Sequence, residues 1–148
     1  MKKNTIVVLR IVLLFMSYNL IIAQNTSSKG ILTVKINNIK TKNGKIIVKL
    51  FKKGDAIFGT PFLQLTAGIT NDVAEVKFED LSFANYVVFA FHDKNNNAIV
   101  DHNLLGFPTE PMGFSNHWNF NLLSGMPTYK KTNFLFSKEN NSISIKVK

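Results

Sequence analysis

The sequence contains no cysteine and only one arginine. Without cysteine there is no disulfide framework, no thiolate-bound zinc, no thiol nucleophile and no diacylglyceryl anchor. Hydrophobic residues make up 45% of the chain and charged residues only 18%, which indicates a packed globular domain rather than a disordered chain. The 148 residues suffice for one ordinary domain, whereas two domains would be small and marginally stable.

The first 23 residues have the features of a secretory signal peptide. Lys2 and Lys3 form a basic start, Ile11 to Ile22 is an apolar stretch, and Ala23 is a small residue at the expected cleavage point. An uncleaved anchor is the alternative interpretation. No second apolar run follows. We therefore expect residues 24–148 to form one exported domain, periplasmic or extracellular, without a membrane span after signal cleavage.

The net charge does not point to nucleic acid. The chain carries +9, and loss of Lys2, Lys3 and Arg10 leaves 15 basic against 9 acidic residues, or +6. Arg10 is the only arginine, so the mature chain lacks the planar guanidinium group that makes paired hydrogen bonds to phosphate and guanine. The lysines also alternate along strand-like runs rather than clustering. We expect a ligand or an envelope or extracellular protein as the partner.

Period-two alternation predicts short β-strands. In Ile31–Ile39 apolar and polar residues alternate, and the Asn43-Gly44 turn followed by Lys45–Phe51 predicts a hairpin with that strand. Tyr86–Phe91 is continuously apolar, as in a central strand. The remaining predicted strands are Phe62–Thr66, Val73–Phe78, Thr132–Phe136 and Ile143–Val147. This pattern predicts an all-β fold, an immunoglobulin-like or transthyretin-like β-sandwich of about seven strands with one long functional loop.

The long loop, residues 93–129, carries a candidate calcium motif. Compact domains seldom hold loops beyond about 12 to 15 residues without a function. Oxygen side chains recur at alternating positions, followed by a position that offers a backbone carbonyl, and such donors converge on a hard cation. The predicted ligands are Asp93, Asn95, Asn97, Ile99 and Asp101.

Two departures from a calcium loop leave another interpretation open. Ala98 stands where glycine allows the sharp turn, and Leu104 stands where a bidentate glutamate completes the shell. Glu110 is a further candidate ligand for the same ion. In the alternative, the run is an Asx-rich turn whose side chains cap their own backbone.

The same region resembles a known family. The runs Phe91 to Asn97, Asp101 to Glu110 and Gly113 to Asn116 resemble the signature of a secreted bacterial family, the domain of unknown function 2141. The resemblance spans about Gly30 to Lys148. It implies export and a sandwich fold, but it implies no activity. Ala98 replaces the glycine that is usual in the family at this position, which weakens the calcium interpretation.

Two further sets of residues are candidates for function. His92, Asp93, His102 and Glu110 would serve a metal-dependent hydrolase, although no tight histidine spacing supports one. The loop aromatics either fold back to cap one end of the sandwich or stay exposed as a glycan or small-ligand site. The candidate ligand-binding residues are Glu110, Phe114, Asn116 and Trp118. We expect a non-enzymatic binding or structural module, with calcium as the one candidate cofactor.

Overall fold

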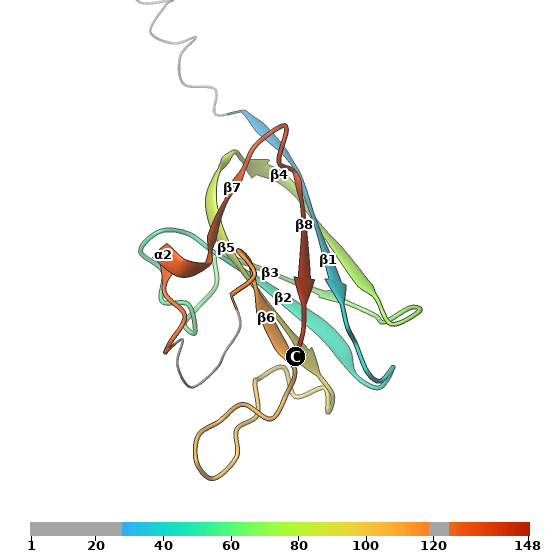
Figure 1. Cartoon of the computed structure of the whole chain (residues 1–148). Coiled ribbons are helices and arrows are strands. Elements are labelled where there is room, and N and C mark those ends of the chain that lie inside the picture. The colour runs from blue at the N-terminus through green and yellow to red at the C-terminus, as the bar shows by residue number, and fades with distance from the viewer. Residues whose placement is uncertain (1–27, 119–124) are drawn as a thin grey trace, which may run out of the picture.

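The computed structural model describes residues 28–118 and 125–148, so the expected signal peptide lies outside the described residues. The fold is all-β, with two sheets packed as layers (Figure 1). One sheet has the order β4(Ala74–Ser82), β1(Lys29–Asn37), β8(Ser142–Lys146). The five-stranded sheet has the order β3(Leu63–Ala67), β2(Lys45–Phe51), β5(Ala84–Asp93), β6(Met112–Phe114), and β7(Asn133–Phe136) also pairs with β5.

The all-β prediction is confirmed, with eight strands among the described residues rather than about seven. The immunoglobulin-like or transthyretin-like topology stays a prediction. One helical turn, α2(Tyr129–Thr132), precedes β7. No helix in residues 28–118 or 125–148 combines the length and apolar character needed to cross a membrane.

The main core lies between the two sheets and follows the predicted alternation. In β1, Leu32, Val34 and Ile36 are fully buried, and their neighbours point away from the core. Strand β4 alternates in the same way and lies beside β1 in antiparallel register. Each of these strands therefore has one apolar and one polar face, as expected for an outer layer whose far side faces water.

Strands β2 and β5 are different because both of their faces are buried. Towards the core they present Ile46, Val48 and Leu50 from β2 and Tyr86, Val88 and Ala90 from β5. On the opposite face a second hydrophobic cluster contains Ile47, Phe51, Val87, Phe89 and Phe91. The prediction of a central strand at Tyr86–Phe91 is confirmed, since β5 pairs with β2, β6 and β7.

The predicted hairpin between the first two strands is wrong. Strand β1 pairs with β4 and β8, whereas β2 pairs with β3 and β5 in the other sheet. The connection through Asn43-Gly44 therefore crosses between the layers. Gly44 has φ +83°, and a Cβ there would collide with the carbonyl oxygen of Asp93. The glycine is required by its close approach to the end of β5, not by a two-residue hairpin.

Strand β6 was not predicted and lies inside the expected long loop. It is only three residues long, too short to show a period. Phe114, Gly113 and Met112 pair with Phe89, Ala90 and Phe91 of β5. The backbone of Met112 also exchanges two hydrogen bonds of 3.1 Å with Lys148, after β8. Strand β6 thus ties the five-stranded sheet to the end of the three-stranded one.

Between β5 and β6 the chain forms a loop, residues 94–111, that extends from the body beside the C-terminus (Figure 1). Leu104 and Leu105 at its tip are almost wholly exposed. Internal hydrogen bonds such as Thr109 N to Asp101 O, 2.9 Å, hold the loop together.

Gly113→Ala tests the tie between the layers. The new Cβ would collide with the carbonyl oxygen of Lys146, so we expect a loss of about 1 to 3 kcal/mol in the free energy of unfolding. Gly68 has open space around its Cβ position, and Gly68→Ala is the matched control. Urea unfolding measures both. Equal stability of the two variants would contradict the close contact between β6 and β8.

Candidate functional site

Aromatic side chains gather on the outer face of the five-stranded sheet. The Phe89 and Phe114 rings stack with their centroids 4.6 Å apart, and Trp118 meets Phe114 edge-on at 5.1 Å. Phe58, from the connection between β2 and β3, contacts Phe89 at 5.7 Å. We call Phe58, Phe89, Phe114 and Trp118 the outer aromatic cluster. Of the loop aromatics, Phe114 and Trp118 therefore cover a sheet face rather than one end of the sandwich, while Phe120 lies outside the described residues.

A pocket of about 560 Å³ opens beside this cluster. Its floor is formed by β2, β5 and β6, and its walls come from the 52–62 connection and from the 94–111 loop. We call it the outer pocket. Its lining residues are Lys49, Ile57, Phe58, Phe89, Ile99, Val100, His102, Gly106, Phe107, Pro108, Met112, Phe114, Trp118 and Met126. The volume falls within the range of small-molecule sites, and most of the lining is apolar, as in such sites.

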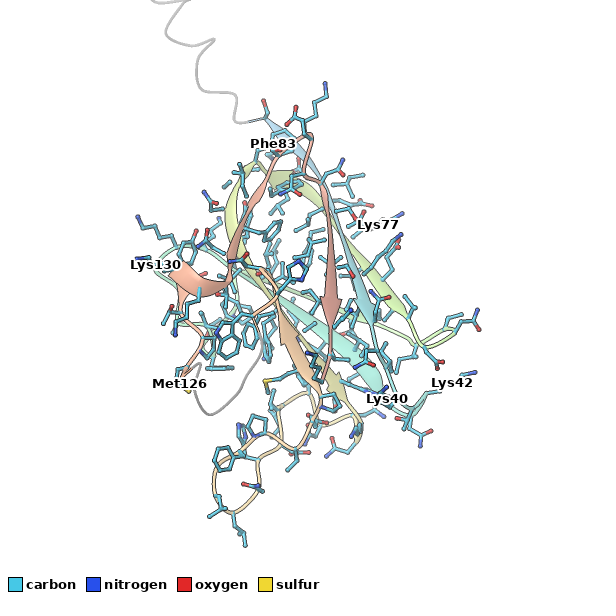
Figure 2. All side chains as sticks on the ribbon, in the orientation of Figure 1. Lys40, Lys42, Lys77, Phe83, Met126 and Lys130 are labelled. Carbon is cyan, nitrogen blue, oxygen red and sulfur yellow. The ribbon has the colours of Figure 1, made fainter. Side chains whose placement is uncertain are left out.

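The electrostatics of the outer pocket come mainly from Lys49. It is the one side chain with a permanent charge among the described lining residues. Its Nζ lies 5.5 Å from the centroid of the Phe91 ring. Other lysines are dispersed: Lys42, Lys77 and Lys130 project from separate parts of the molecule (Figure 2).

Two tyrosines, Tyr86 of β5 and Tyr129 of α2, donate hydrogen bonds to backbone carbonyl oxygens. Burial, and then the neighbouring Tyr129, raise the pKa of Tyr86, and burial raises the pKa of Tyr129. The Tyr129 hydroxyl donates to the Asn85 carbonyl oxygen at 3.1 Å. It thereby fixes α2 against β5.

The candidate calcium loop is organised by Asp93, which is fully buried at the end of β5. Its Oδ1 accepts from the backbone N–H of Asn97 at 3.0 Å, and its Oδ2 from that of Ala98 at 2.9 Å. The Lys45 ammonium lies 3.5 Å from Oδ2. A buried carboxylate requires such partners. Asp93 thus holds the first turn of the loop on the sheet.

Asp101 gathers the side chains of the same turn. Its two carboxylate oxygens accept from Asn95 Nδ2 at 2.7 Å and Asn97 Nδ2 at 2.9 Å. The amide oxygens of the two asparagines accept from backbone N–H groups two residues ahead, Asn97 at 3.2 Å and Ile99 at 3.0 Å. These are Asx turns, as in the alternative interpretation.

Glu110, near the end of the 94–111 loop, connects that end to earlier residues of the same loop. It is buried, and its oxygens accept from the backbone N–H of Lys94 at 2.8 Å and of Asp101 at 3.4 Å. The structure thus brings Asp93, Asn95, Asn97 and Asp101 into one hydrogen-bonded network, with Glu110 beside it. Ile99 was predicted to offer its backbone carbonyl, and its side chain, 61% exposed, lines the outer pocket.

The candidate hydrolase residues are separated. His92 is buried, and its Nε2 lies 2.7 Å from the Asn43 carbonyl oxygen. His102 lines the outer pocket, whereas His117 borders a smaller hollow beside β8. Within residues 28–118 and 125–148, no three His, Cys, Asp or Glu side chains form a group suited to a metal ion. Ser115 Oγ accepts from Val88 N–H at 2.9 Å and is itself buried.

Of the candidate ligand-binding residues, Phe114 and Trp118 line the outer pocket, while Glu110 and Asn116 do not. Asn116 Nδ2 donates to the Lys131 carbonyl oxygen at 3.0 Å. Sequence reasoning missed Lys49, Phe89 and Phe58. The available signal was that Tyr86–Phe91 lacks a polar face, which implies a second buried surface on the other side of that strand.

Comparison with protein families agrees with the sequence resemblance. A family model described as an uncharacterized protein conserved in bacteria, DUF2141, matches residues 34–144. The chain belongs to the DUF2141 family. The match to DUF2141 extends from β1 into β8 and includes both the outer pocket and the 94–111 loop. No curated protein and no solved structure matches the chain.

Ala98→Gly tests whether the loop holds a strained turn. Ala98 has φ +64°, a left-handed conformation that costs an L-residue about 1 to 2 kcal/mol. We expect glycine to raise the free energy of unfolding by about 1 kcal/mol, measured by urea denaturation. The control is Ala84→Gly at an exposed position in β5, where we expect a loss of about 0.5 to 1 kcal/mol. Destabilisation by both variants would contradict this account.

Proposed function

We propose that the protein is an exported, non-enzymatic binding module whose outer pocket takes small apolar molecules. The observation that carries the proposal is the pocket itself, about 560 Å³, lined by three buried residues of the sheet, Phe89, Met112 and Phe114. Side chains on paired strands hold their positions more rigidly than side chains on loops. The pocket therefore has a preformed floor, with aromatic faces and edges for contact with a ligand.

The lining favours an apolar small molecule over a glycan. Sugar recognition needs several hydrogen-bond partners for hydroxyl groups, because a buried hydroxyl without a partner is costly. Among the described lining residues, Lys49, His102 and Trp118 carry polar side-chain atoms, and the rest have apolar side chains or none. The indole nitrogen of Trp118 is itself buried. Glu110, which was expected to contact a ligand, is instead bonded to the backbone of its own loop.

The 94–111 loop has a supporting role in this proposal. It contributes Ile99, Val100 and Phe107 to the pocket wall. Its hydrogen-bonded network around Asp93 and Asp101 orients that wall against the sheet. A change in the network would therefore alter the pocket without touching its floor.

The binding proposal is tested with N-phenyl-1-naphthylamine, an uncharged apolar probe that fluoresces in apolar surroundings. We expect the probe to become fluorescent with the protein and to bind about fivefold more weakly to Phe58→Ala, which loses one aromatic contact. Phe62→Ala is the control, because Phe62 stacks on Tyr86 and does not line the pocket. Lack of probe binding by the unaltered protein would overturn the proposed function.

We further propose that calcium stabilises the loop. Support comes from the carboxylate of Asp101 and the side-chain oxygens of Asn95 and Asn97, which lie within one turn. Binding would require both amides to turn their oxygens towards Asp101. We expect millimolar calcium to raise the Tm, and Asp101→Asn to abolish the rise. An unchanged Tm would overturn the calcium proposal and leave the loop supported by its hydrogen bonds.

A further inference from the structure

Lys49 occupies an unusual position for a lysine. It lies in the middle of β2, directly opposite Phe89 of β5 in the antiparallel register. Its neighbours on the same face of β2 are Ile47 and Phe51, both buried in the second hydrophobic cluster. Its side chain is half-buried and lines the outer pocket. Lys49 thus contributes a positively charged side chain to a pocket whose lining is mostly apolar.

The contrast with Lys45 shows what Lys49 lacks. Lys45 lies on the same face of β2, and its ammonium is 3.5 Å from the buried carboxylate of Asp93. Among residues 28–118 and 125–148, no acidic side chain forms an ion pair with Lys49. The Phe91 ring, 5.5 Å away, gives only a partial substitute for an anion.

Partial burial makes this ammonium a good partner for an incoming anion. Removal of water from a charged group costs free energy, and a counter-charge in the same low-dielectric setting recovers it. The described lining contains no carboxylate that would repel an anion. An anionic group on an apolar molecule would therefore meet Lys49 while the body of the molecule contacts the outer aromatic cluster.

The chemistry of the Lys49 ammonium indicates which kind of anion it would bind. Lys49 is a single point charge, and the only arginine of the chain is Arg10, within the expected signal peptide. A phosphate dianion is better matched by several donors or by a guanidinium fork. A monoanionic carboxylate needs one cation. We propose that the outer pocket binds apolar carboxylates, with Lys49 Nζ as the partner of the carboxylate; this inference rests on the proposed function.

The test compares ligands that share one alkyl chain. Decanoate, decanol and decyl phosphate are each titrated against the protein loaded with N-phenyl-1-naphthylamine, below their micelle concentrations. A hydrogen bond to a charged group corresponds to roughly a ten- to hundredfold change in affinity. We expect decanoate to displace the probe at about one tenth or less of the decanol concentration, and decyl phosphate to be no better than decanoate.

The variant Lys49→Gln removes the positive charge and leaves the other lining residues of the outer pocket unaltered. We expect this variant to lose the preference for decanoate over decanol, with both ligands compared by their displacement of the probe from the same variant. Lys77→Gln is the matched control, because Lys77 is an exposed lysine of β4 in the other sheet. It should keep the preference. Lys49→Met, which keeps an apolar stem of similar length, should behave like Lys49→Gln.

The outcomes distinguish the two proposals. Binding of neither the probe nor decanoate to the unaltered protein would overturn the proposed function and this inference together. Probe binding with equal displacement by decanoate and decanol would overturn the inference alone, as would a preference retained in Lys49→Gln. Stronger binding of decyl phosphate than of decanoate would overturn the assignment to carboxylates.

Discussion

The structure depends on one constraint, that both faces of the neighbouring strands β2 and β5 are largely apolar and must be covered. A sheet in a simple sandwich buries one face and leaves the other to water. Here Phe89 and Phe91 lie opposite the main core, and their exposure would cost roughly 1.5 to 3 kcal/mol each. Chain segments between the strands therefore pack over the outer face. The described parts of these segments, in residues 28–118 and 125–148, leave the outer pocket between them.

The sequence could predict which residues form strands but not which strands pair. Alternation identifies the inner faces of β1 and β4 because the other face of each strand is exposed to solvent. It therefore puts Leu32 and Val76 in the core, where the structure has them. Pairing depends on contacts between residues that are distant in the sequence. The Asn43-Gly44 dipeptide fits a connection between two sheets as well as it fits a hairpin within one sheet. Strand β6 escaped prediction because Met112 to Phe114 is too short for any period and exists only through its register with β5.

The site was half predictable for the same reason. Trp118 and Phe114 stand out in sequence as aromatics in a polar, proline-containing segment, and both line the pocket. Lys49 looks like any strand lysine, since its sequence neighbours do not reveal that its face of the sheet is covered. Glu110 was a candidate for ligand contact as a carboxylate of the long loop. In the structure it is buried and accepts hydrogen bonds from the backbone of that loop.

The parallel pairing of β1 with β8 has a consequence for how the chain reaches this state. Thr33 lies opposite Ser142 and Asn37 opposite Lys146, so the three-stranded sheet joins the beginning of the domain to its end. Contacts of such long sequence separation form slowly, because the closure entropy is lost before the contacts form. Before β8 has been synthesised, β1 of a nascent chain lacks one of its two neighbouring strands. The three-stranded sheet is completed only when β8 has been synthesised, and until then one edge of β1 remains open to wrong partners.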